Sequence, residues 1–301
     1  MIREAIDAVV SGQSLSMEEA TTVMREIMED EATPAQLGAY LTALSIKGET
    51  PEEIAGMATV MREKALRVNV HGPLIDTAGT GGDGKGTFNI STAAAFVAAG
   101  AGLKVAKHGN RAASGTCGSA DVLEALGVRI DLAPKGVEQC INQVGMGFMF
   151  APVFHPAMRY AAPVRREIGI RTVFNILGPL TNPAGAQSQL LGVGYANMGE
   201  HMASVLRLLG VHHALIVHGE DGLDELTLNT NTSVWEVRDG NIRTWSLPVA
   251  DTGLSQASLD QIQGGTKEEN ATTMRRIFQG EPGPLRDAVL LNSGATLVAG
   301  D

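Results

Sequence analysis

The sequence predicts an α/β protein in which a small all-helical domain precedes a larger α/β domain with a mostly parallel central sheet flanked by helices. Two observations support this prediction. The first 68 of the 301 residues show only helical signals, and from residue 72 onward short apolar runs alternate with helical stretches. This alternation is typical of a mostly parallel sheet that is covered by helices on both faces.

Helix starts in the N-terminal part share one signal. Ser16, Thr33 and Thr50 are each followed three residues later by Glu or Gln, which is the spacing of a capping box. Pro34 and Pro51 stand at the first helical position, where a missing backbone N–H costs nothing. Apolar residues then recur at helical spacing, which indicates packing surfaces within the domain or between subunits.

The larger domain is expected to contain short strands, the helices between them and a hairpin. The apolar runs that predict strands cover 74–75, 103–106, 148–150, 190–193 and 214–217, and helices are expected over 91–100, 120–126 and 198–209. Near the end, 234–237 and 242–245 flank Asp239-Gly240, a signal for a two-residue hairpin turn. Ligands of open α/β sheets bind beyond the carboxyl ends of strands, so functional residues are expected after the apolar runs.

Composition and charge limit the class of protein. Hydrophobic residues make up 44% of the chain and charged residues 19%, as in ordinary globular proteins. The net charge of −10 argues against a nucleic-acid partner, which would need a basic surface. The longest apolar stretch, 93–103, is too short to span a membrane, and the first residues do not resemble a signal peptide. We expect a soluble, cytoplasmic protein without a membrane partner.

The stretch 76–92 carries the strongest functional signal. Five glycines lie within the eight residues 79–86, directly after an apolar run, and a helical segment follows. A strand, exposed backbone N–H groups and a helix N-terminus together are how many proteins hold phosphate. The alternative is a glycine-rich loop that only turns the chain.

Two common nucleotide motifs fit this loop incompletely. The spacing of its glycines satisfies the dinucleotide fingerprint, but Lys104, Lys107 and His108 stand where that fingerprint has an acidic residue. The loop also resembles a P-loop, except that Gly86 replaces the Ser or Thr that binds magnesium. Asp83 within the loop suits a ligand that arrives with a metal ion or presents ribose hydroxyls. A nicotinamide dehydrogenase is therefore disfavoured.

A second loop, 107–119, combines potential cations with small polar residues. Lys107, His108 and Arg111 would supply charge to an anion, with hydroxyl and backbone donors around it. The alternative is a solvated basic loop. Cys117 lies in the same loop, but no base is identifiable beside it, so we reject a nucleophilic role.

The segment 218–225 contains four carboxylates within six residues, a composition that suits a hard divalent ion such as Mg²⁺. A solvent-facing acidic turn is the alternative. Two phosphate-type loops and a carboxylate loop are complementary parts of a magnesium–diphosphate site. Arg165, Arg166 and Arg171 could bind a planar carboxylate, although the sequence does not say which of them turns inward.

Seven segments together resemble anthranilate phosphoribosyltransferases over nearly the whole chain. They are GTGGD at 79–83, NIST at 89–92, KHGNR at 107–111, GSADVLEALG at 118–127, HPAM at 155–158, PVRREIGIRTVFNILGPLTNP at 163–183 and HGEDGLDE at 218–225. Pyrimidine nucleoside phosphorylases have a similar fold and share single motifs, whereas the full set is specific. The resemblance implies a helical domain formed by 1–68 with about 166–186, an α/β domain formed by 72–165 and 187–301, and a homodimer formed through the helical domain.

The resemblance also implies the activity, the site and a Mg²⁺ cofactor. The enzyme would transfer the phosphoribosyl group of 5-phosphoribosyl 1-diphosphate to the amino group of anthranilate, in the second step of tryptophan biosynthesis. The implied phosphoribosyl diphosphate site comprises Gly79, Gly82, Asp83, Thr87, Asn89, Ile90, Ser91, Thr92, Lys107, His108, Gly109, Asn110, Arg111, Ala112, Ala113, Ser114, Gly115 and Ser119. Anthranilate would contact Gly79, Asn110 and Arg165, and Mg²⁺ would be held by Ser91, Asp224 and Glu225.

Catalysis is expected to be mainly electrostatic. Lys107, His108 and Arg111 are the candidates for stabilising the leaving diphosphate, and no strong base is needed because an aromatic amine is already neutral. Thr116 replaces a frequent Lys or Arg and Gly115 a frequent serine, and Asp301 lies where relatives usually continue. A pyrimidine nucleoside phosphorylase-like enzyme and a non-catalytic relative that binds phosphoribosyl ligands remain as alternatives.

Overall fold

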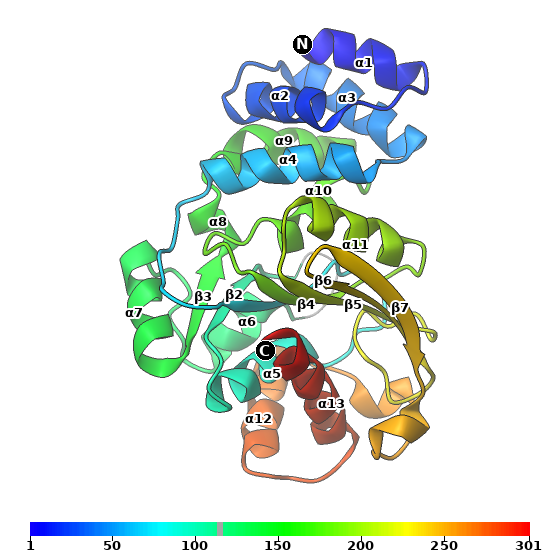
Figure 1. The fold of residues 1–301 in the computed structure, drawn as a ribbon. Helices are drawn as coiled ribbons and strands as arrows, with labels where there is room; N and C mark the ends of the chain where they lie inside the picture. Colours follow the sequence, from blue (N-terminus) through cyan, green and yellow to red (C-terminus); the bar gives the residue numbers. More distant parts are fainter. Residues whose placement is uncertain (113–116) are drawn as a thin grey trace.

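The computed structural model describes residues 1–112 and 117–301 and begins with a helical bundle (Figure 1). Its helices are α1 (Ile2–Val10), α2 (Met17–Met28), α3 (Pro34–Lys47) and α4 (Pro51–Lys64). The three expected capping boxes are confirmed, because each Ser or Thr side chain accepts from the backbone N–H three residues on. The helix starts are therefore encoded locally.

The larger part of the chain is built on one seven-stranded sheet. Its strands are β1 (Ile75–Gly79), β2 (Val105–Gly109), β3 (Met146–Phe150), β4 (Ser188–Gly192), β5 (His213–Gly219), β6 (Thr232–Arg238) and β7 (Asn241–Leu247). The spatial order is β3-β2-β1-β4-β5-β6-β7, parallel from β3 to β5 and antiparallel for the last two strands. The predicted mostly parallel sheet is confirmed.

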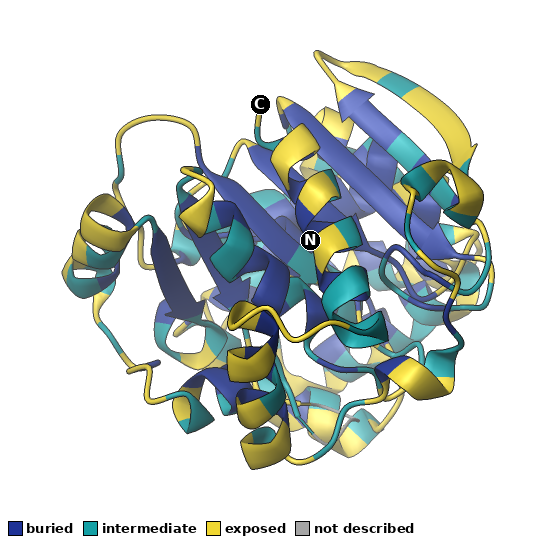
Figure 2. Cartoon of the chain, turned by 90° about the horizontal axis from the view of Figure 1, so that it is seen from below, coloured by how far each residue is buried: buried dark blue, intermediate teal, exposed yellow. Residues whose placement is uncertain are grey.

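The predicted hairpin joins β6 to β7. Arg238 pairs with Asn241, so Asp239 and Gly240 form a two-residue turn with φ of 49° and 77°. A positive φ at both central residues matches the right-handed twist of the flanking strands. β7 lies at the sheet edge and is exposed along most of its length, whereas β5 is buried throughout (Figure 2).

Helices cover both faces of the sheet. The helices described after β1 are α5 (Ile90–Gly100), α6 (Ser119–Ala125), α7 (Pro134–Val144), α8 (Ala151–Phe154), α9 (Met158–Ile168), α10 (Phe174–Leu177), α11 (Met198–Leu208), α12 (Lys267–Phe278) and α13 (Pro284–Ala299). α5 and α13 pack together on one face, and α11 packs on the other between the sheet and α4 (Figure 1). Within the described residues, no helix is long and apolar enough to cross a membrane.

The chain returns to the helical bundle after β3. α9 packs against α2 and α3, and a single apolar cluster runs from α1 through α4 and α9 to α11. The returning helix, α9, begins at Met158. This packing places the segment after α9 between the bundle and the carboxyl ends of the parallel strands.

Candidate active site

The strand order reverses between β1 and β4, and the glycine loop begins at this switch point. β1 and β4 pair from Ile75–Ser188 to Gly79–Gly192, and chain connections from the two strands run to opposite sides of the sheet. Gly81, Gly82, Gly84 and Gly86 all have positive φ, between 61° and 77°. The loop thus follows a path that residues with a Cβ rarely adopt, at the place where open α/β sheets bind ligands.

Asp224 lies directly against the beginning of the glycine loop. Its Oδ2 accepts a hydrogen bond from the Gly81 amide at 3.0 Å. A methyl group on Gly79 would come within 2.7 Å of the same oxygen, and one on Gly192 within 1.6 Å of the Asp224 backbone oxygen. Glycines at the ends of β1 and β4 are therefore required for the acidic segment to approach the loop.

Glu225 lies at the N-terminus of α5. Its Oε1 accepts a hydrogen bond from the Ser91 amide at 3.1 Å. Asn89, which precedes the helix, does not cap it; its side chain binds the Cys117 carbonyl and the Asn270 amide instead. The structure thus brings Ser91 and Glu225 together, although they are 134 positions apart in the sequence.

The acidic residues at the loop carry mutually repelling charges. Burial is the main cause that raises the pKa of Asp224, and the charge of Asp83 adds to it. Burial, followed by the charge of Asp224, raises the pKa of Glu225 to about 8. Asp83 Oδ2 is buried and has no hydrogen-bond partner within the described part of the chain. These carboxylates would be stabilised by a divalent cation.

The donor set fits Mg²⁺ bound together with a phosphorylated substrate. Among residues 1–112 and 117–301, no three Asp, Glu, His or Cys side chains form a site able to hold a metal ion alone. Mg²⁺ in proteins is usually bound by one or two carboxylates, with waters and substrate phosphates completing its octahedron. Ser91, Asp224 and Glu225 would supply such a partial set of ligands.

Lys107 differs from the sequence-based expectation. The sequence predicts a loop position, but Lys107 lies within β2 and is only 2% exposed. Its ammonium donates to the Thr77 carbonyl and, at 3.2 Å, to Thr77 Oγ1. Burial lowers the pKa of Lys107, while the charges of Asp76 and Glu225 raise it. Lys107 thus offsets buried carboxylates beneath the site.

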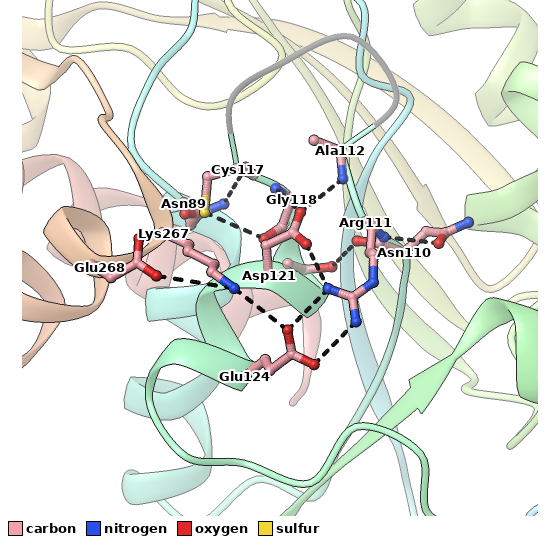
Figure 3. A network of polar contacts seen from close by, with 11 residues as sticks. Asn89, Asn110, Arg111, Ala112, Cys117, Gly118, Asp121, Glu124, Lys267 and Glu268 are labelled. Carbon is pink, nitrogen blue, oxygen red and sulfur yellow. Dashed lines mark hydrogen bonds and ion pairs between the residues drawn. The ribbon is translucent and has the colours of Figure 1, made fainter.

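Arg111 is held by carboxylates of α6. Its guanidinium lies 2.9 Å from Asp121 and 3.0 Å from Glu124, and Lys267 approaches Glu124 from α12 (Figure 3). These hydrogen bonds raise the pKa of Arg111 above its ordinary value. The side chain is 45% exposed, and its charge is already paired. Its expected role toward the diphosphate remains a prediction.

The described residues on either side of the gap between β2 and α6 are held by hydrogen bonds. Asp121 Oδ2 accepts from the amides of Gly118 and Ala112, and Ser119 Oγ donates to the Asn110 carbonyl at 3.2 Å. A methyl group on Gly109 would lie 2.3 Å from Ser119 Oγ. Ala113, Ser114 and Gly115 of the predicted phosphate site, and Thr116 beside them, lie outside the described residues.

Two histidines that face each other line the site on the β2 side. The rings of His108 and His155 lie 4.9 Å apart, and burial lowers the pKa of His108 to about 3 and that of His155 to about 4. His108 Nδ1 lies 3.1 Å from the Gly178 carbonyl, so this nitrogen carries the proton. Nε2 of each ring is buried and without a partner in the described chain. His108, like Lys107, belongs to β2 and not to a loop.

Of the two adjacent arginines in α9, Arg165 turns toward the interior. Its guanidinium lies 4.9 Å from the centre of the Phe174 ring, and burial lowers its pKa. Arg166 is exposed. Within the described residues the Arg165 side chain has no ion pair, so it can accept a carboxylate.

The remaining predicted residues surround the start of α5. Thr87 forms an isolated bridge with Gln263, and the side chains of Ile90 and Thr92 are each 1% exposed. These side chains pack inward, so any contact with a ligand would come from their backbone. The start of α5 lies close to Glu225, because the Ser91 amide donates a hydrogen bond to the Glu225 carboxylate.

The sequence motifs assign no role to Asp76, Asn182 or His155. Asp76 accepts from the His108 amide at 3.2 Å and from Asn182 Nδ2 at 2.7 Å, and burial raises its pKa to about 6. Asn182 also donates to the Ala106 carbonyl. These contacts join β1, β2 and the segment after α10. Asp76 lies in β1, His155 directly follows α8, and Asn182 lies in the segment before β4, so no shared local signal in the sequence marks them.

Known proteins share this architecture. The glycosyl transferase family helical bundle domain matches residues 3–65, and the glycosyl transferase family a/b domain matches residues 71–301. Among curated relatives, anthranilate phosphoribosyltransferase of Chloroflexus aggregans is 61% identical over 302 residues, and that of Dehalococcoides mccartyi is 58% identical over 303. Each comparison covers 100% of this chain and 89% of the relative.

Solved structures agree with these comparisons. The crystal structure of anthranilate phosphoribosyltransferase from Thermus thermophilus is 51% identical, with a TM-score of 0.93 over 98% of this chain and 89% of that chain. The Saccharomyces cerevisiae enzyme in complex with PRPP and Mg is 28% identical, with a TM-score of 0.88 over 97% of this chain and 86% of that one. With the family domains, the relatives and the site geometry in agreement, the chain belongs to the anthranilate phosphoribosyltransferase family.

Proposed function

We propose that this chain transfers the phosphoribosyl group of 5-phosphoribosyl 1-diphosphate to the amino group of anthranilate, giving N-(5-phosphoribosyl)anthranilate and diphosphate. The observation that carries the proposal is the convergence of the glycine loop, the Ser91 end of α5 and the Asp224–Glu225 pair at one switch point. Related proteins have been solved with PRPP and Mg and with 4-fluoroanthranilate. The reaction is the second step of tryptophan biosynthesis from chorismate.

The glycine loop would hold the diphosphate of the donor substrate. Backbone N–H groups of a loop with successive positive-φ residues form a concave anion site. Mg²⁺, when bound, stabilises the charge that develops on the leaving diphosphate as the bond to ribose C1 breaks. Ser91, Asp224 and Glu225 would hold the ion. The ammonium of Lys107 partly balances the negative charges of the buried carboxylates of Asp76 and Glu225.

The second substrate would enter beside the two imidazoles. Arg165 would bind the anthranilate carboxylate, and Gly79 and Asn110 would border the ring. The amine attacks ribose C1 as the bond from C1 to diphosphate breaks, and the proton that the nitrogen then carries passes to an oxygen of the leaving diphosphate, which is the stronger base. The bare Nε2 of His108 or His155 faces no other donor among the described residues and would accept an amine N–H. Since both imidazoles are neutral, they orient the lone pair of the nucleophile toward C1.

Assembly, location and domain division belong to the same proposal. We place the chain in the cytoplasm and assign 1–68 with about 166–186 to the helical domain. A homodimer through that domain is supported by Val10 and Ile46, which are 69% and 82% exposed on α1 and α3. Burying such apolar surface favours association. Light scattering of the wild type and of Ile46→Asp tests this, since a monomeric wild type would exclude the dimer.

The activity is tested by following anthranilate fluorescence in the presence of phosphoribosyl diphosphate and Mg²⁺. We expect the signal to fall as product forms, and the loss should require all three components. Thymidine with inorganic phosphate serves as the opposing assay, because a nucleoside phosphorylase would release thymine and 2-deoxyribose 1-phosphate from it. A folded sample that leaves anthranilate unchanged would exclude the transferase, and would support a non-catalytic relative if phosphoribosyl diphosphate still bound.

The assignment of Arg165 is tested by a matched pair of variants. Arg165→Gln is expected to raise the KM for anthranilate about tenfold or more, because it removes a charge-assisted hydrogen bond to the carboxylate. Arg166→Gln changes the neighbouring exposed arginine and should leave both KM values unchanged. An equal effect of the two variants would mean that Arg165 contributes only surface charge.

A further inference from the structure

Arg171 connects the helical bundle with the glycine loop. It lies between α9 and α10, and its backbone carbonyl accepts a hydrogen bond from Ser45 Oγ of α3 at 3.2 Å. Its guanidinium reaches the loop itself. A methyl group on Gly82 would lie 1.8 Å from Arg171 Nη1, 2.7 Å from Cζ and 3.1 Å from Nη2. The plane of the side chain thus rests against the backbone of the loop.

The Arg171 guanidinium has no anionic partner in the described residues. The structure shows no hydrogen bond or ion pair of this side chain there, and its aromatic neighbour, Tyr195, has its ring centre 5.9 Å away. By contrast, Lys107 is bound to Thr77, and Arg111 is paired with two carboxylates. Arg171 is therefore a cation beside the phosphate loop whose hydrogen-bonding capacity is unused.

The charge of the expected ligand calls for such a cation. A diphosphate with one Mg²⁺ still carries a net negative charge, and a planar guanidinium binds phosphate oxygens in a bidentate manner. Gly82 follows Gly81, whose amide binds Asp224, so Arg171 approaches the loop next to the proposed metal ligands. A cavity of about 300 Å³ beside Arg171, lined also by Ser45, Thr172 and Tyr195, leaves room for the guanidinium to adjust.

We propose that Arg171 is a diphosphate-binding residue that ties the helical bundle to the glycine loop when the donor substrate is bound. This inference rests on the proposed transferase function. Arg165 is assigned to the carboxylate of anthranilate, so the two arginines bind different substrates. Because the Arg171 carbonyl is held by Ser45, binding of diphosphate would also fix the position of the bundle relative to the loop.

The test is calorimetric titration of the full chain with inorganic diphosphate in the presence of Mg²⁺. Arg171→Gln is expected to weaken the Kd for diphosphate about tenfold or more, because a charge-assisted bidentate contact is lost. Arg171→Lys keeps the charge without the planar fork and should recover only part of the affinity. Arg166→Gln, an exposed arginine of the same region, is the control and should bind as the wild type does.

Kinetics separates this role from a structural one. Arg171→Gln should raise the KM for phosphoribosyl diphosphate while leaving the KM for anthranilate unchanged, and its melting temperature should match that of the wild type. Unchanged diphosphate binding in Arg171→Gln would overturn the inference, as would a rise confined to the anthranilate KM. A wild type that binds no Mg²⁺–diphosphate would instead contradict the proposed function itself, so the two failures are distinguishable.

Discussion

Gly79 and Asp224 approach each other so closely that the glycine has no room for a side chain. A methyl group at residue 79 would lie 2.7 Å from Asp224 Oδ2, the oxygen that also accepts the Gly81 amide. The contact joins the end of β1 to the acidic segment after β5. The shape of the phosphate loop and the position of a proposed metal ligand are thereby set by one close approach.

Gly79→Ala is expected to displace Asp224 and to lower kcat/KM by at least about tenfold, or roughly 1.4 kcal/mol of transition-state stabilisation. Gly100→Ala is the control, because Gly100 ends α5 with nothing within 4 Å of an added methyl group and without a positive φ. Steady-state kinetics with both substrates measures the effect. Equal activity of the two variants would show that the loop tolerates the displacement.

The acidic pair gives a prediction for pH and metal together. The pKa of Glu225 is raised from its ordinary 4.5 to about 8, so the folded chain keeps a proton that the unfolded chain releases. The contribution of Glu225 to the free energy of unfolding of the metal-free protein should therefore fall as the pH rises from 4.5 to about 8. Mg²⁺ competes with this proton, so the stabilisation by Mg²⁺ should grow over the same range.

Thermal melts in the presence of diphosphate, with and without Mg²⁺, across this range check the prediction. Asp224→Asn combined with Glu225→Gln should remove the dependence of the Mg²⁺ effect on pH, and activity should then need about tenfold more Mg²⁺. Glu220→Gln removes an exposed carboxylate of the same segment and should behave as the wild type does. If Mg²⁺ stabilised the wild type, the double variant and Glu220→Gln equally at every pH, Asp224 and Glu225 would not be metal ligands.

The two facing histidines should remain neutral well below pH 6.5. Burial lowers the pKa of His108 to about 3 and that of His155 to about 4. Below pH 6.5 the unfolded chain binds protons at these two histidines and the folded chain does not, so their contribution to stability should fall as the pH decreases below 6.5. Imidazole NMR signals, assigned by their loss in His108→Gln and His155→Gln, report the titration. Midpoints near the ordinary value of 6.5 would contradict the buried, neutral pair.

Local signals are sufficient for much of the fold. The capping boxes at Ser16, Thr33 and Thr50 and the hairpin turn at Asp239-Gly240 depend on residues a few positions apart, and the structure has them where the sequence predicts them. Such signals work because a capped helix start or a positive-φ turn is determined by neighbouring residues.

Contacts between residues that are far apart in the sequence cannot be predicted from such local signals. The sequence favours a loop position for Lys107 because a charged residue seldom lies in a buried strand, yet Thr77, 30 positions away, supplies its hydrogen-bond acceptors. The ion pairs of Arg111 depend on how α6 folds back, and the contact of Arg171 with Gly82 depends on the bundle. Charge and residue type indicate which cations could bind a ligand, but tertiary packing determines which of them are already paired with other protein groups.

A buried ion pair in the helical bundle gives a stability prediction that is independent of the active site. Glu53 is fully buried; its Oε1 accepts the Leu15 amide at 2.9 Å, and its Oε2 lies 3.0 Å from Lys47 Nζ. Glu53→Gln should lower the free energy of unfolding by about 3 kcal/mol, because it leaves a buried ammonium without its counter-charge. Glu52→Gln, on the exposed side of the same turn, should cost less than about 1 kcal/mol. Urea denaturation measures both values, and equal losses would show that the buried charge of Glu53 contributes nothing specific.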